Sequence, residues 1–190
     1  MPVQLIEPRR FGDERGWFTE FYSVRAFAER GIDDVFVQDN HSLSAPAGTL
    51  RGLHFQAPPA AQAKLVRCIA GAIWDVAVDA RRGSPTYGRW VAAELSADNG
   101  RQLFVPRGFL HGFVTLVPDT QVTYKVSDFY APAQDGGIAW DDPDLALPWP
   151  LDGRVPELSA KDRTQPRFRD WDSPFDYDGV PLMPLEESTR

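Results

Sequence analysis

The sequence has little cysteine, little histidine and no excess of basic residues. Its one cysteine, Cys68, excludes an intramolecular disulfide and fits a reducing compartment. The formal net charge is -7, which argues against a nucleic-acid binder, because affinity for a phosphate backbone needs a basic face. No charged-then-apolar leader opens the chain, and no apolar run approaches the length of a membrane span. We therefore expect a cytoplasmic protein that binds neither nucleic acid nor membrane.

The chain does contain enough apolar material for a substantial core. Hydrophobic residues make up 43% and aromatic residues 12% of its 190 residues, which is typical of a globular protein rather than a disordered one. This length predicts one domain, or one domain with a tail. We place the domain at residues 1–165 and an irregular tail at residues 166–190, loosely attached from residue 177 onward.

Turn-forming residues recur about every ten positions, with little helical periodicity between them. This spacing predicts an all-β sandwich or barrel with a few short helices. We expect residues 64–79 to form a hairpin that turns at Gly71. The only convincing helix in the first two-thirds of the chain covers residues 23–30, with Ser23 as its cap and Gly31 at its end.

The stretch from Gly48 to Gln56 is the most informative part of the sequence. It places Arg51 and His54 three residues apart among apolar residues and two glycines. An imidazole can move a proton near neutral pH, and a guanidinium can hold an anion such as a phosphate. The plain alternative is a strand with one half-buried, hydrogen-bonded histidine. Strict alternation puts the two side chains on opposite faces, so either Gly52 marks a bulge or Arg51 serves a different pocket.

Other side chains that could take part in catalysis or binding each have an ordinary structural explanation. Strand alternation places Tyr124 on one face with Val122 and Val126, so its ring is expected to point inward. A core tyrosine whose hydroxyl bonds a backbone carbonyl explains this equally well. Lys64 can be a solvated lysine, and Asp162 can belong to a surface capping box.

Three histidines in strand-like surroundings could bind zinc or iron, as jelly-roll proteins often do. They are His41, His54 and His111. No two of them are spaced i, i+2 on one strand, and no nearby carboxylate completes an obvious ligand set. We therefore expect no metal site.

Ten short motifs occur in an order that points to one family. The list is Asp13-Glu-Arg-Gly16, Gln38-Asp-Asn-His-Ser42, Leu50-Arg-Gly-Leu-His-Phe-Gln56, Lys64-Leu-Val-Arg67, Asp75-Val-Ala-Val-Asp79, Ser84-Pro-Thr86, Pro106-Arg-Gly-Phe-Leu-His-Gly-Phe113, Tyr124-Lys125, Phe129-Tyr-Ala-Pro132 and Leu158-Ser-Ala-Lys-Asp162. Over residues 3–165 the chain resembles the dTDP-4-dehydrorhamnose 3,5-epimerase family. The resemblance implies a cupin-like jelly roll, a homodimer, no metal or organic cofactor, and a dTDP-sugar substrate with a keto group at C4.

The resemblance also implies roles for particular residues. His54 matches the base, Asp162 its partner and Tyr124 the acid, while Lys64 matches the group that faces the keto oxygen. Further matches to substrate-contacting positions, some supplied by the partner subunit, are Arg15, Glu20, Gln38, Asp39, Asn40, Arg51, His111, Tyr130, Asp135 and Lys161. Asp135 replaces a glutamate often found there, and Phe129 stands where many members have tyrosine. The first strand, at residues 3–6, is expected to join the partner's sheet.

The chemistry of these side chains agrees with the implied reaction. A C–H bond beside a carbonyl becomes acidic enough for a histidine base when the enolate is stabilised. Inversion needs a second group, such as Tyr124, that delivers a proton to the opposite face. We therefore predict epimerisation at C3 and C5 of dTDP-4-keto-6-deoxy-D-glucose to give dTDP-4-keto-L-rhamnose. Four alternatives stay open: an epimerase acting at C3 or C5 alone, a cupin ketoisomerase, a metal-dependent cupin oxygenase, and a non-catalytic sugar-binding module.

Overall fold

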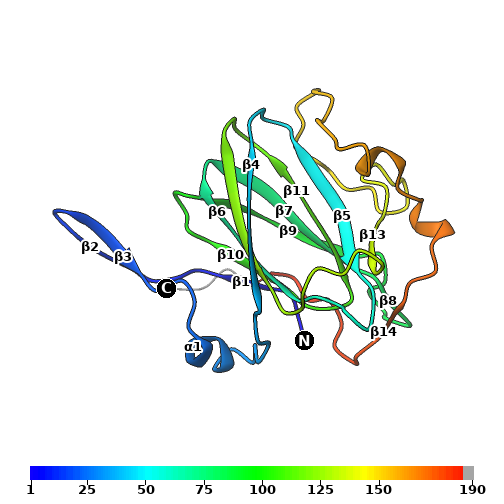
Figure 1. Cartoon of the computed structure of the whole chain (residues 1–190), viewed down its shortest axis with the longest axis horizontal. Coiled ribbons are helices and arrows are strands. Elements are labelled where there is room, and N and C mark those ends of the chain that lie inside the picture. The colour runs from blue at the N-terminus through cyan, green and yellow to red at the C-terminus, as the bar shows by residue number, and fades with distance from the viewer. Residues whose placement is uncertain (186–190) are drawn as a thin grey trace.

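Two five-stranded antiparallel sheets pack face to face and form the body of the molecule (Figure 1). The computed structural model describes residues 1–185. In spatial order, the first sheet contains β1 (Gln4–Ile6), β10 (Gln102–Val105), β6 (Lys64–Ala70), β12 (Thr120–Val126) and β4 (Gln38–Ser44). The second contains β13 (Asp135–Gly137), β5 (Leu50–Gln56), β11 (Phe109–Thr115), β7 (Ala72–Asp79) and β9 (Trp90–Ser96). The predicted all-β sandwich is confirmed.

Alternating apolar residues from both sheets fill the space between them. Val66 and Val122 of the first sheet pack in one cluster with Ile73, Leu95 and Phe113 of the second. All five side chains are at least 95% buried. Because successive strand residues point to opposite faces, this cluster fixes which residues of each strand point inward.

The strands at residues 64–79 do not form the predicted hairpin. β6 pairs with β10 and β12 in the first sheet, whereas β7 pairs with β11 and β9 in the second. Gly71, with a φ of 75°, turns the chain from one sheet into the other. A Cβ at this position would lie 2.4 Å from the Thr120 hydroxyl, so the corner needs glycine.

The segment beyond β13 covers the outer face of the second sheet. It contains two 3-10 helices, η1 (Asp162–Thr164) and η2 (Phe168–Asp170), and the short strand β14 (Phe175–Asp176), which pairs with β8 (Arg81–Arg82). Phe168 and Phe175 pack with Val76, Leu110 and other outward-facing residues in a second core cluster. Figure 1 shows this orange and red segment running along the side of the sandwich.

The C-terminal part of the described chain is therefore anchored rather than loose. Asp178 lies 2.6 Å from the buried Arg81 guanidinium, and Leu182 is only 8% exposed. The predicted division into residues 1–165 and 166–190 stays a prediction, and residues 186–190 lie outside the described part. The two core clusters explain the attachment, because removal of the segment would expose the outer apolar face of the second sheet.

The N-terminal region adds one strand to the first sheet and then leaves the sandwich, and the pairing of residues 3–6 with a partner's sheet stays a prediction. β1 pairs with β10 of its own chain, so one of its edges is already occupied. The hairpin of β2 (Arg10–Asp13) and β3 (Gly16–Thr19) instead projects away from the sandwich (Figure 1). Helix α1 (Val24–Ala28) lies within the predicted range, and Ser23 occupies its N-cap position without a side-chain hydrogen bond.

Candidate functional site

The predicted base lies on a strand that has one extra residue. His54 of β5 pairs with His111 of β11, but Arg51 pairs with Phe113, so three steps on β5 match two steps on β11. Gly52 accommodates the extra residue of β5 with a φ of 141°. A Cβ there would lie 2.6 Å from the Gly112 Cα atom. Because paired residues point to the same face, Arg51 and His54 both face inward. The bulge alternative is confirmed.

His54 and Asp162 form a dyad across 108 residues of sequence. The His54 Nε2 and Asp162 Oδ1 atoms are 2.5 Å apart, and the Ser159 hydroxyl donates to the other carboxylate oxygen at 2.9 Å. Burial would raise the pKa of Asp162, but the bonds from His54 and Ser159 outweigh it and lower the pKa below its usual value. An ionised carboxylate only accepts hydrogen bonds, so Nε2 carries the proton and Nδ1 is the ring nitrogen that can accept another one.

Tyr124 points between the sheets with its hydroxyl uncommitted. It pairs with Val66 and Asn40 on the inner face of the first sheet and packs against the central core. The hydrogen bonds among residues 1–185 include none to its hydroxyl, so the structure does not show the bond to a backbone carbonyl. Burial raises the pKa of Tyr124 above its usual value, although the charge on Arg51 works against it. The phenol therefore keeps its proton at neutral pH and can donate it.

Lys64 is the inward-facing cation at the beginning of β6. It pairs with Val126, the inward residue two positions beyond Tyr124. Burial lowers the pKa of Lys64 to about 8, against the opposing charges of Asp75 and Asp135. No described carboxylate lies within 4 Å of its ammonium group. A cation held in this way is available to a negatively charged oxygen of a ligand.

The inner faces of β4 and β5 contribute further polar side chains. Gln38 donates to Asn40 at 2.9 Å, and both alternate inward with Ser42 beside Tyr124. Arg51 reaches across to β4, where it donates to the Ser44 hydroxyl and the Leu43 carbonyl. These groups offer the donors and the positive charge that a diphosphate or a sugar hydroxyl would need.

A second polar group forms at β13, next to the dyad. The Asp135 carboxylate accepts from Lys161 at 2.5 Å and from the Tyr130 hydroxyl at 3.1 Å. Gln56 holds the loop that carries Tyr130 by bonding the backbone at Phe129 and Ala131. Because Gly137 pairs with His54, this group is placed within one strand of the base.

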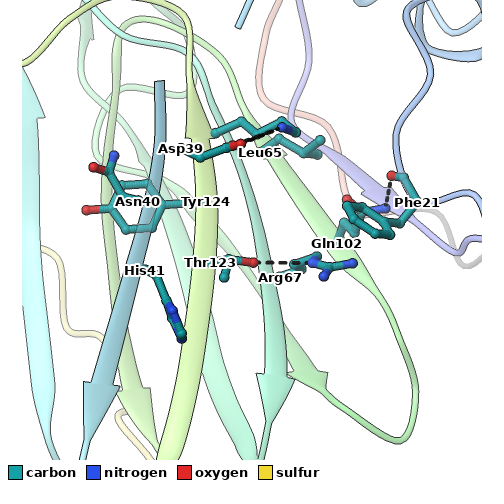
Figure 2. Close-up of a pocket in the computed structure, with 10 residues that line it drawn as sticks. Phe21, Asp39, Asn40, His41, Leu65, Arg67, Gln102, Thr123 and Tyr124 are labelled. Atoms are coloured by element: carbon teal, nitrogen blue, oxygen red, sulfur yellow. Dashed lines mark hydrogen bonds and ion pairs between the residues drawn. The ribbon is translucent and has the colours of Figure 1, made fainter. Parts of the chain in front are cut away.

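Three of the predicted site residues do not lie on the inner faces of the two sheets. Asp39 points to the outer face of β4, where it pairs with Lys125 at 2.9 Å, and Figure 2 shows it on the side of the sheet opposite Tyr124. It lines an outer depression of about 260 Å³ that also contains Arg67. Arg15 is in the turn of the projecting hairpin, and Glu20 follows that hairpin. Arg15 bonds Asp13 of the same turn, and Glu20 lines a surface depression with helix α1.

Asp75 and Ser159 contact predicted site residues, and sequence reasoning missed both. Asp75 is completely buried on the inner face of β7, and its Oδ1 atom lies 2.7 Å from Nε2 of His111. The alternation that made Tyr124 inward-facing could also have placed Asp75 inward, between the apolar Ile73 and Ala77. Ser159 lies three residues before Asp162, and only its contact with the carboxylate reveals it.

The three histidines do not assemble into a metal centre. His54 and His111 each direct Nε2 at a carboxylate, whereas His41 lies on the outer face and bonds Gln121. Residues 1–185 contain no group of three His, Cys, Asp or Glu side chains placed to hold a metal ion. Within the same residues, no helix is both long and apolar enough to cross a membrane.

Comparison with known proteins identifies the family. The family model described as dTDP-4-dehydrorhamnose 3,5-epimerase matches residues 2–170. A dTDP-4-dehydrorhamnose 3,5-epimerase from Sinorhizobium fredii is 53% identical over 92% of this chain and 89% of its own length.

Two crystal structures extend the comparison to the fold. The epimerase from Bacillus anthracis with TDP and PPi bound is 54% identical, with a TM-score of 0.85 over 87% of this chain and 93% of that one. The enzyme from Legionella pneumophila in complex with dTDP-4-keto-L-rhamnose is 44% identical, with a TM-score of 0.87 over 92% and 93%. The jelly-roll sandwich, the order of the motifs and these similarities lead to one conclusion: the chain belongs to the dTDP-4-dehydrorhamnose 3,5-epimerase family.

Proposed function

We propose that the protein epimerises dTDP-4-keto-6-deoxy-D-glucose at C3 and C5 to give dTDP-4-keto-L-rhamnose. The observation that carries this proposal is the placement of the His54–Asp162 dyad opposite a tyrosine with a free hydroxyl. A base and an acid on facing sheets are what inversion requires, because one proton is removed from one face of the sugar and another is delivered to the opposite face. Binding alone would need neither group.

Each proton transfer has a named group in this proposal. Nδ1 of His54 takes the proton from the carbon beside the C4 carbonyl, and Asp162 stabilises the imidazolium through Nε2. Electron density moves to the carbonyl oxygen, where the Lys64 ammonium stabilises the enolate. Tyr124 then protonates the same carbon from the other side. Since C3 and C5 both flank C4, one pair of groups serves both centres if the sugar ring shifts between the two steps.

Binding of the nucleotide portion is assigned to the polar groups around this centre. Arg51 lies on the same inner face of β5 as His54, and Gln38 and Asn40 lie on the inner face of β4, so we assign them to the diphosphate and the sugar. Tyr130, held by Asp135 beside Lys161, presents a ring that is more than half exposed and suits stacking on a base. That no cofactor takes part, and that the protein is cytoplasmic, stay predictions.

Product analysis tests the reaction directly. Incubated with dTDP-4-keto-6-deoxyglucose and a downstream 4-keto reductase, the protein should give a sugar inverted at both C3 and C5. One-dimensional and coupling-resolved proton NMR of the reduced product reads each centre separately. In D2O both positions should carry deuterium. A product inverted at one centre alone would replace the proposal with a single-centre epimerase.

We also propose that the protein acts as a homodimer built through the projecting β2–β3 hairpin. The exposed fractions of Phe11, Trp17 and Phe18 are 52%, 59% and 70%, which leaves a large apolar surface in water. Arg15 and Glu20, which match substrate-contacting positions, lie on or just after this hairpin, which projects away from the sandwich of its own chain (Figure 1). A second copy would cover the apolar surface and receive both side chains in its site.

Substitution of the hairpin tests this assembly. The double variant Trp17→Ser/Phe18→Ser should move the protein from dimer to monomer in light scattering at micromolar concentration and should lose most of its activity. Val155→Ser is the matched control, because Val155 is 85% exposed on another part of the surface. A wild-type monomer that is fully active, or a double variant that remains dimeric, would contradict the proposal.

A further inference from the structure

The inner faces of the two sheets carry two opposite charges, and each of them lacks an expected partner. Asp75 Oδ2 is the single buried side-chain polar atom within residues 1–185 that has no hydrogen-bond partner. Lys64, on the other sheet, has no ion pair to a described carboxylate. A buried carboxylate oxygen without a partner is destabilising, so such atoms concentrate at sites where function retains them.

The position of Asp75 connects it to two residues of the candidate site. Its register partner on β11 is Phe113, so its side chain lies on the same inner face as His111. Oδ1 is 2.7 Å from His111 Nε2, which leaves the negative charge of the carboxylate only partly compensated. Its charge also reaches Lys64, where it is the largest influence that favours the ammonium form against burial.

We propose that Asp75 is a positioning residue of this site. One of its oxygens fixes the His111 ring, so that Nδ1 of His111 faces the ligand. The charge on the other oxygen keeps Lys64 an ammonium ion where the enolate oxygen forms. This inference rests on the proposed epimerase function for the role of Lys64, but the coupling between the two charges can be measured without turnover.

Several other charged and ionisable groups lie around Lys64 and Asp75. The other charges acting on Lys64 are Asp135, which raises its pKa, and Lys161, which lowers it. Within residues 1–185, the remaining ionisable side chains on the surrounding inner surfaces are Arg51, His54, Cys68, Asp79, His111, Tyr124 and Asp162, and Asp79 is bonded to Arg81. Burial raises the pKa of Cys68 to about 11, and that of Tyr124 rises above its usual value of 10.0. Neither interferes with a titration near pH 8.

The sign of the expected change follows from the charges. Burial lowers the pKa of Lys64 and the charge on Asp75 raises it. Removal of that charge should therefore move the pKa from about 8 to a lower value. Below that pKa Lys64 is an ammonium ion in both proteins, and above it the variant loses the proton first. The loss of kcat/KM in the variant must therefore grow as the pH rises, whereas a purely structural defect would lower kcat/KM equally at every pH.

The chain has only three lysines, Lys64, Lys125 and Lys161, which makes a direct measurement feasible. Protein labelled with ¹³C at the lysine Cε atoms gives three side-chain signals, assigned with single Lys→Arg variants. In the wild type, the Lys64 signal should titrate at about pH 8. In Asp75→Asn its midpoint should move to lower pH, and kcat/KM should fall roughly tenfold at pH 8.5, the ratio that corresponds to one pH unit of displacement.

Glu94→Gln is the matched control for loss of one negative charge. Glu94 lies on β9 beside Ala93, the register partner of Asp75, but its side chain is exposed on the other face. This variant should leave the Lys64 midpoint and the pH profile unchanged. If Asp75→Asn does not fold, Asp75→Ser, which leaves room for water, is used with the same readouts.

Two outcomes separate this inference from the proposed function. A Lys64 midpoint that is unchanged in Asp75→Asn, with kcat/KM lowered equally at all pH values, overturns the role of Asp75 while the epimerase proposal stands. A wild-type protein without turnover overturns the epimerase proposal, and the midpoint shift then still decides whether Asp75 acts on Lys64.

Discussion

His54→Ala should abolish both epimerisation and the exchange of the substrate's α-protons with D2O. In the proposed mechanism His54 is the group that forms the enolate, and Asp162 acts through its bond to the imidazole. We expect a loss of roughly 10³-fold or more, within the usual range for a general base. Proton NMR in D2O follows both processes in one experiment.

His41→Ala is the matched control, since His41 lies on the outer face of β4 and bonds Gln121. It should retain both activities. Binding of thymidine diphosphate to His54→Ala, measured by calorimetry, shows that the site is still formed. Exchange at the wild-type rate in His54→Ala would mean that another group is the base.

Tyr124→Phe should separate exchange from inversion. The ring remains in the core cluster, so the site keeps its shape and only the hydroxyl is lost. His54 can still remove a proton, exchange it with solvent and return deuterium to the same face. We expect the substrate to gain deuterium with its stereochemistry largely retained, while epimerisation falls by about 10²-fold or more.

Tyr22→Phe makes the same chemical change outside the site, where Tyr22 packs against Phe27 and Phe36. It should behave as the wild type. If Tyr124→Phe epimerises at a near wild-type rate, Tyr124 is not the acid, and Tyr130 or a bound water becomes the candidate. Loss of exchange as complete as in His54→Ala would show that Tyr124 is also needed to form the enolate.

Local rules predicted the parts of the structure that depend on local geometry. The two-residue period placed Val122, Tyr124 and Val126 on one inward face, and the structure confirms it. The same period could have shown that Asp39, between Gln38 and Asn40, points the other way. The conflict between Arg51 and His54 was also visible, and the glycine between them was the correct indication of a bulge.

Features that depend on distant parts of the chain could not be obtained in this way. Nothing in residues 64–79 reveals that the two strands belong to different sheets, because the partners of β6 and β7 are distant in sequence. Asp75 looked like one polar residue in an apolar strand, and only the facing His111 and Lys64 give it a role. The sequence around Asp162 also fits a capping box, and only the docking of its segment beside β5 brings Asp162 to His54.

That placement determines when the enzyme becomes competent as it is made. Both sheets are complete once β13, which ends at Gly137, has emerged from the ribosome, but Asp162 emerges 25 residues later on the segment that covers the second sheet. On a nascent chain, all ten strands of the two sheets therefore precede the carboxylate that His54 contacts. Under the proposed mechanism, catalysis begins only after the segment that carries Asp162 has docked, so activity reports a finished protein and not merely a folded sandwich.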